Sequence, residues 1–216
     1  MLKRLLALLV LPVATLFVIA GCSTTPAPSS NGDDDKTSQS DEGDDDESEA
    51  PAEGELADPG TRVGEGEWLT HSFTSTDDGE ALISAQLVSV EPATDEEAAF
   101  IVAAFDAGKL DGYDFWLIHV DEKKESGDSI AFDSDYAYFD VVDEDGTQVQ
   151  GITLIGWDGC PSESFSEEFD TAGAVITQCF IAAAKDGDNE PAGVSYGGGY
   201  EDDNPYEDKP LLFIKG

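Results

Sequence analysis

The sequence predicts a mainly β domain over residues 67–216, built as an antiparallel sandwich or barrel and interrupted by one short helix. Three observations support this prediction. Short apolar stretches with strand-like patterns recur along the segment, turns rich in glycine and aspartate separate them, and one stretch has helical spacing instead. Several short strands at this spacing are typical of all-β sandwiches and barrels. About 150 residues also suffice for one domain with its own core.

The expected strands follow one another along the chain. His71 lies in a strand near the start of the domain. Residues 81–87 alternate apolar and polar side chains, as a half-buried strand does. Residues 113–120 are apolar on both faces, which is typical of a central strand. Further strands are expected within four later stretches: 135–142, 147–157, 174–183 and 210–214.

The stretch 95–107 predicts a helix. Thr94 and Glu97 have the spacing of a capping box, and Gly108 is a residue type that ends helices. One helical face would carry Ala98, Ile101, Val102 and Phe105. We therefore expect this helix between two strands, packed over one end of the sandwich.

The N-terminal residues 1–21 have the anatomy of a secretory signal peptide. Lys3 and Arg4 precede an apolar stretch that is too short to span a bilayer. Residues 19–22, Ile-Ala-Gly-Cys, resemble the lipobox of bacterial lipoprotein precursors. That resemblance implies that Cys22 receives a diacylglyceryl group, with acyl chains such as palmitate, after cleavage just before it. The lipid would hold the protein on the extracytoplasmic face of the cell membrane. A plain secretory signal is the alternative.

The chain is strongly acidic, with 48 Asp and Glu residues against 10 Lys and Arg and a formal net charge of −38. Nucleic-acid binding is disfavoured, because its affinity depends on cations that neutralise phosphates. Electrostatic binding to anionic lipid is disfavoured for the same reason. The charge favours a well-solvated surface, cations or basic partners.

Residues 22–66 predict a disordered stalk that begins at the lipidated cysteine. The stretch 23–66 has no aromatic residue and is rich in Asp, Glu, Ser and Pro. Such a composition cannot bury enough apolar surface to offset the entropy of folding. The stalk would lift the domain at 67–216 away from the membrane.

The domain also resembles a known family. The stretch "GYDFWLIHV" is followed by a "DEDG" hairpin, then by Trp157-x-x-Cys160 and by Cys179 within a strand. Together with the acidic stalk, these features resemble the telokin-like, immunoglobulin-type domains of lipoproteins and secreted antigens from Gram-positive bacteria. The resemblance implies an antiparallel sandwich of seven or eight strands with no established chemistry.

Cys160 and Cys179 predict a disulfide. Once Cys22 is acylated, these two form an even pair in an oxidising compartment. The alternatives are a metal site, which usually needs closely spaced Cys or His sets, and a redox pair, which usually has the form C-x-x-C. Neither pattern is present.

Acidic turns are weak candidates for a calcium site. Asp143 and Asp145 fit two ligand positions of an EF-hand around Gly146, but the first ligand and the terminal Glu of that motif are missing. Asp186 and Asp188 could supply oxygen ligands from another turn. A calcium-dependent adhesion or stability module is therefore one alternative function, and otherwise no cofactor is expected.

The loop after residue 195 is the candidate binding surface. Its composition is shared by adaptable binding loops, and its candidate contact residues are Tyr196, Tyr200, Asp202, Asp203 and Tyr206. We expect a non-enzymatic protein that binds or displays to an unknown protein or cell-wall partner.

A cell-envelope hydrolase is the second alternative function. No motif pairs His71 or His119 with a nucleophile, and carboxylates are too abundant to single out a catalytic pair. No catalytic residue is assigned.

Overall fold

The computed structural model describes five stretches of the chain: 54–76, 79–105, 108–171, 173–199 and 204–216. Cys22 lies outside the described residues, as do Tyr200, Asp202 and Asp203 of the candidate binding loop. Within the described stretches, no helix combines the length and apolar character needed to cross a membrane.

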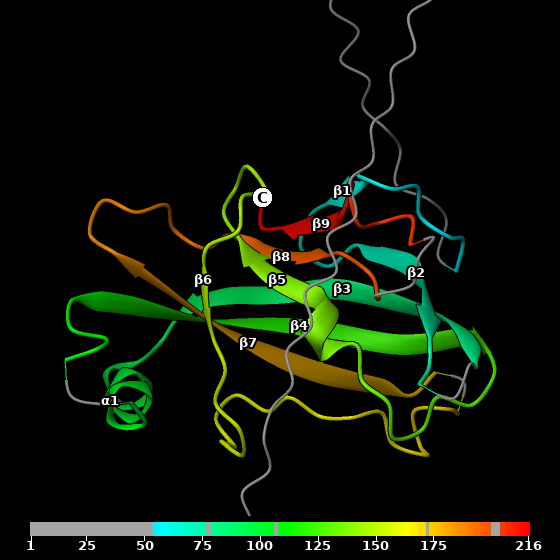
Figure 1. The fold of residues 1–216 in the computed structure, drawn as a ribbon, viewed down its shortest axis with the longest axis horizontal. Coiled ribbons are helices and arrows are strands. Elements are labelled where there is room, and N and C mark those ends of the chain that lie inside the picture. The colour runs from blue at the N-terminus through cyan, green and yellow to red at the C-terminus, as the bar shows by residue number, and fades with distance from the viewer. Residues whose placement is uncertain (1–53, 77–78, 106–107, 172, 200–203) are drawn as a thin grey trace, which may run out of the picture. The chain divides into compact units, whose positions relative to one another are not determined.

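Two sheets pack face to face (Figure 1). The five-stranded sheet has the order β2-β3-β4-β7-β6, with bounds Trp68–Thr74, Glu80–Pro92, Tyr113–Gly127, Val175–Lys185 and Gln150–Ile152. The four-stranded sheet has the order β1-β9-β8-β5, with bounds Arg62–Val63, Leu211–Ile214, Gly193–Tyr196 and Phe139–Val142. All neighbouring strands run antiparallel except β1 and β9. The predicted fold class, a mainly β immunoglobulin-like sandwich with one short helix, is confirmed.

Strand β4 is the central strand that its two-sided apolar pattern predicts. It pairs with β3 on one side and β7 on the other. Trp116 and Ile118 face the core between the sheets. Phe115 and Leu117 belong to a second core cluster, which includes Ile101 of the helix. Both faces of β4 are therefore covered.

The other strand predictions hold in part. The apolar positions of β3 are buried as expected, among them Ala81 and Leu87. The stretch 135–142 divides into a 3-10 helix, η1 (Tyr136–Tyr138), and strand β5. Strand β8 was not predicted, because its four residues, Gly-Val-Ser-Tyr, are too few to establish a strand period.

Helix α1 (Asp95–Ala103) lies at one end of the sandwich, between β3 and β4 in the chain (Figure 1). The predicted capping box is present: the Glu97 N–H donates to Thr94 Oγ1, and the Thr94 N–H donates to Glu97 Oε2 over 2.7 Å. The helix ends at Ala103, with Ala104 as its C-cap, and so stops short of the predicted end at residue 107. Ile101 is the only fully buried residue of α1, so the buried face of the helix is narrower than the four-residue apolar face that the sequence predicts.

The boundary expected at residue 66 lies too late in the chain. Ala57 and Val63 are buried, and β1 pairs with β9. The Tyr206 hydroxyl donates to the Ala57 carbonyl over 3.2 Å. The acidic, proline-containing composition of this segment predicts disorder. The residues that pack against it lie far away in sequence, so a local pattern does not reveal these contacts.

The predicted disulfide between Cys160 and Cys179 is present, with the Cα atoms 5.0 Å apart. Both cysteines are buried in the core cluster that contains Ile101 of α1. The bridge ties strand β7 to the long segment between β6 and β7.

Candidate metal centre

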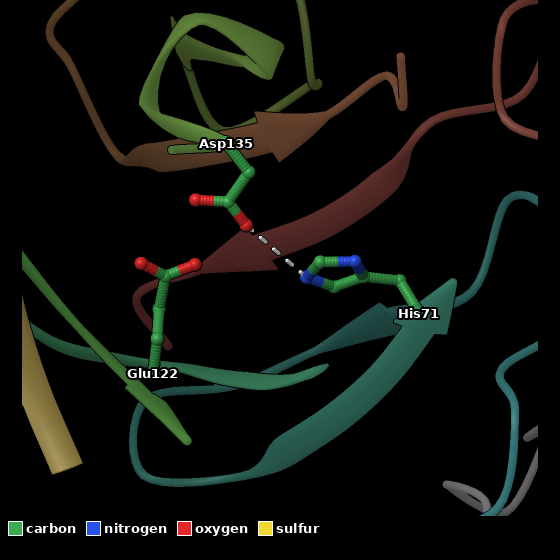
Figure 2. Close-up of side chains that lie close together, drawn as sticks. All are labelled: His71, Glu122 and Asp135. Carbon is green, nitrogen blue, oxygen red and sulfur yellow. Dashed lines mark ion pairs between the residues drawn. The ribbon is translucent and has the colours of Figure 1, made fainter. Parts of the chain in front are cut away.

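Three ionisable side chains meet in the interior of the sandwich (Figure 2). His71 comes from β2, Glu122 from β4, and Asp135 from the segment just before η1. Each side chain is 0% exposed. One ligand atom from each lies within 4.8 Å of the other two, and within the described stretches no other group of three His, Cys, Asp or Glu side chains is arranged in this way.

Strand alternation places two of these side chains inside. Leu69, His71 and Phe73 alternate along β2 and are all buried, so His71 occupies an inward position. Glu122 follows the inward residue Val120 on β4 in the same way. Asp135 is positioned by the turn of η1, since its carbonyl accepts the Tyr138 N–H over 2.8 Å.

The imidazole of His71 is held by its surroundings. Nδ1 lies 3.3 Å from the Ser72 carbonyl, which can only accept, so this contact assigns the proton to Nδ1. The ring stacks on Tyr196 with centroids 3.7 Å apart and meets Phe139 edge-on at 6.3 Å. Nε2 faces the carboxyl groups and lies 3.8 Å from Asp135 Oδ2. In the neutral ring its lone pair is available to a ligand.

The polar atoms that face one another in this centre make no hydrogen bond of good geometry, although the carboxyl groups of Glu122 and Asp135 interact with each other and Gln178 interacts with Glu122. These atoms are His71 Nε2 and both carboxyl oxygens of Glu122 and Asp135, and they are all of the unpaired buried side-chain atoms found in the described residues. Other buried polar groups are paired: Thr70 Oγ1 lies 2.7 Å from Ser84 Oγ. Because buried polar groups in proteins are nearly always paired, five unpaired atoms in one place require an explanation.

Burial shifts the pKa of all three groups toward their neutral forms. Burial raises the pKa of Glu122 well above its usual value, and the negative charge of Asp135 adds to this. Burial raises the pKa of Asp135 to about 6. Burial lowers the pKa of His71 to about 3. Protons therefore compete with any other cation for this centre.

The sequence pattern points to only one member of this centre. It places His71 in a strand without a partner, and it does not distinguish Glu122 or Asp135 from the other acidic residues. A signal did exist for Glu122, because it continues the inward series of Ile118 and Val120 on β4. His119 is half-buried and lies 3.2 Å from Ser89 Oγ, so it takes no part in the centre.

The acidic turns have structural roles. One oxygen of Asp143 accepts the N–H groups of Asp145 and Thr147, and the other accepts the side-chain amide of Asn189. These bonds hold the pKa of Asp143 below its usual value. Asp188 accepts the Lys185 N–H. Asp143, Asp145, Asp186 and Asp188 do not come together as a ligand group among the described residues.

The candidate binding loop borders an open cleft of about 390 Å³. Its described lining includes Ser72, Tyr138, Ser126 and Asn204. Asn204 shapes the loop, because its amide donates to the carbonyls of Gly197 and Gly199 over 2.7 Å each.

Two predicted contact residues of this loop are core residues. Tyr196 ends β8 and is 0% exposed, and Tyr206 is 1% exposed. Their rings pack on each other with centroids 5.8 Å apart. The expectation that these two side chains project toward a partner is therefore wrong. Their polar composition resembled that of a surface loop, but each hydroxyl donates to a backbone carbonyl.

A hydrolytic role for the buried centre finds no support in this geometry. General acid–base groups must come within hydrogen-bond reach of the substrate. His71, Glu122 and Asp135 are all 0% exposed, so a substrate does not contact them.

No protein-family model matches the chain. A search of curated proteins also finds no match. Among solved structures, the chain is similar to a secreted protein from Mycobacterium tuberculosis, MPT63. The sequences are 15% identical, the TM-score is 0.44, and the match covers 72% of this chain and 96% of the other. This likeness concerns the β-rich fold alone.

Proposed function

We propose that the protein is a lipid-anchored binding module on the extracytoplasmic face of the cell membrane. The lipobox-like residues before Cys22 support the anchor, and the acidic composition of the stalk supports its role as a spacer. Membership of the telokin-like lipoprotein family is part of this proposal. Binding is proposed without catalysis.

The observation that carries the binding proposal is the open cleft beside the loop that contains Asn204. Its volume of about 390 Å³ lies in the range of sites for small molecules or short polymer segments. Hydroxyl and amide groups line it at Ser72, Thr74, Ser126 and Asn204, and its described lining holds one charged residue, Glu80.

These groups favour an uncharged, hydrogen-bonding segment of a cell-envelope polymer. The net charge of −38 acts against an anionic ligand. Neutral donors and acceptors, in contrast, can be satisfied by the hydroxyl and amide groups of the cleft.

A sedimentation assay with purified cell walls tests the binding proposal. Ser126 is exposed in the cleft wall, so Ser126→Tyr fills the cleft without disturbing the core. We expect wall binding to fall at least tenfold in this variant. Ser164→Tyr, at an exposed position outside the cleft lining, is the matched control and should bind as the wild type. Equal binding by both variants would contradict the proposal.

The anchor has a separate test. Cys22→Ala in the full chain removes the thiol that would be acylated. We expect the wild-type protein to incorporate labelled fatty acid and to sediment with membranes, and the variant to do neither. Incorporation of label into the variant would refute lipidation at Cys22.

A further inference from the structure

We infer that His71, Glu122 and Asp135 bind one divalent transition-metal ion of the Zn²⁺ type inside the sandwich. The centre offers one imidazole nitrogen and two carboxyl groups whose ligand atoms lie within 4.8 Å of one another. Histidine nitrogen and carboxylate oxygen are both zinc ligands. The inference is independent of the cleft and of the lipid anchor.

Charge and hydrogen bonding both favour a dication at this position. When a dication binds, the two carboxyl groups release their protons and, with one neutral imidazole, supply two negative charges that the dication neutralises. Buried charges in proteins are paired or coordinate metals. The five buried atoms of the centre that lack a hydrogen-bond partner are the atoms that an ion would coordinate.

His71 has the second contact that metal-binding histidines need. Such a histidine usually donates its other ring N–H to a carbonyl or carboxylate, which fixes the tautomer and the ring orientation. Here the Ser72 carbonyl, 3.3 Å from Nδ1, has this role. Stacking on Tyr196 holds the ring with Nε2 toward the carboxyl groups.

The spacing suits a small ion after a modest contraction. Metal–ligand bonds of about 2.0–2.2 Å in a tetrahedral site separate the ligand atoms by about 3.3–3.6 Å. His71 Nε2 and Asp135 Oδ2 already lie 3.8 Å apart. The Glu122 carboxyl faces the same space from β4 (Figure 2). Rotation of the two acidic side chains completes the approach.

The ligand set also selects against calcium. Calcium takes six to eight oxygen ligands, whereas this centre presents one nitrogen and four carboxyl oxygens. A mixed nitrogen and oxygen set favours zinc and related transition ions. The weak calcium candidates Asp143 and Asp188 are separate from this centre.

Burial of the three ligands should make release of the bound ion slow. The many surface carboxylates also attract cations, but those ions exchange freely with solvent. An ion held by three side chains that are 0% exposed leaves only when the surrounding structure opens. Slow release to a chelator therefore distinguishes the buried site from the acidic surface.

The test is a titration of the purified full chain, stripped with a chelator and then supplied with Zn²⁺ or Co²⁺ at high salt. We expect one equivalent to bind tightly and leave slowly, and the melting temperature to rise by more than about 5 °C. Bound Co²⁺ should show the intense visible absorption of a four-coordinate ion. His71→Gln and Glu122→Gln should each lower the affinity at least a hundredfold, and His119→Gln is the matched control that should retain it.

Two results would overturn the inference. One is tight binding that is equal in His71→Gln and in the wild type, which would place the ion on the surface. The other is a wild-type protein whose Co²⁺ absorption is that of the hydrated ion. The second result decides the question even if His71→Gln fails to fold.

Discussion

Tyr196 of β8 stacks on His71 of β2 with the ring centroids 3.7 Å apart, so the two sheets meet directly at the buried centre. The Tyr196 hydroxyl donates to the Ser72 carbonyl over 3.1 Å, the same carbonyl that Nδ1 of His71 approaches. Ser72 and Tyr196 also line the cleft. The cleft and the centre therefore share a wall.

Substitutions at Tyr196 should separate stacking from hydrogen bonding. Tyr196→Phe keeps the ring, and His71 still approaches the Ser72 carbonyl, so we expect a loss of about 1 kcal/mol in unfolding free energy. Tyr196→Ala also removes the ring from the core and should cost about 3–5 kcal/mol. Urea unfolding measures both values. Equal losses in the two variants would mean that the stacked ring contributes nothing.

The metal-free protein should lose stability as the pH rises from the usual pKa of Glu122 to its raised pKa. Between its usual pKa and its raised pKa, Glu122 binds more protons in the folded state than in the unfolded state, so the unfolding free energy falls with pH. His71, with its pKa lowered to about 3, has the opposite effect, but only up to its usual value of 6.5. Asp135, with its pKa raised to about 6, acts in the same direction as Glu122 up to that pH. Each such group changes the unfolding free energy by up to about 1.4 kcal/mol per pH unit.

Glu122→Gln should remove this dependence, because the amide has nearly the shape of the acid and cannot ionise. In chelator at pH 8 we expect this variant to be more stable than the wild type by about 1–3 kcal/mol. Chemical unfolding of both proteins at pH 6 and pH 8 shows whether the difference in their unfolding free energies has the predicted sign. A wild-type protein whose stability is flat over this range would show that folding does not raise the pKa of Glu122 into it.

The disulfide should contribute to stability mainly through the loop that it closes. Cys160 and Cys179 are 19 residues apart, and a loop of this size corresponds to about 3 kcal/mol. We expect the double variant Cys160→Ala/Cys179→Ala to lose about that much in urea unfolding. Reduction should raise the intact mass of the wild-type protein by two hydrogens. An unchanged mass would show that the two thiols are unpaired.

The capping box should stabilise α1 locally. Thr94→Ala removes the side chain that accepts the Glu97 N–H, a change worth about 1 kcal/mol. Hydrogen exchange of the α1 amides should then quicken about fivefold. Thr171→Ala, at an exposed position outside helices and strands, is the control. Equal exchange rates of the α1 amides in the two variants would mean that the capping box contributes nothing to the stability of the helix.

Local patterns predicted much of this fold. The two-sided apolar pattern of 113–120 predicted the central strand, and the spacing of Thr94 and Glu97 predicted the start of the helix. The even number of cysteines that remains once Cys22 is acylated predicted the disulfide between Cys160 and Cys179. Each of these predictions depends on neighbouring residues or on a simple count.

The buried centre could not be predicted in the same way. His71 and Glu122 lie 51 positions apart on β2 and β4, two strands with β3 between them in the sheet, and Asp135 lies on irregular backbone just before η1. A histidine in a strand is common, and one acidic residue out of 48 does not stand out. The prediction that Tyr196 and Tyr206 form a binding surface is wrong for a related reason. The residue types of a polar loop do not reveal which of its aromatic rings are buried.

X-ray diffraction from crystals of the purified protein grown with Zn²⁺, measured on both sides of the zinc absorption edge, tests the central claim most directly. We predict one strong anomalous peak inside the sandwich, bonded to His71 Nε2 and to carboxyl oxygens of Glu122 and Asp135. Anomalous peaks confined to surface carboxylates, with none between these three side chains, would contradict it.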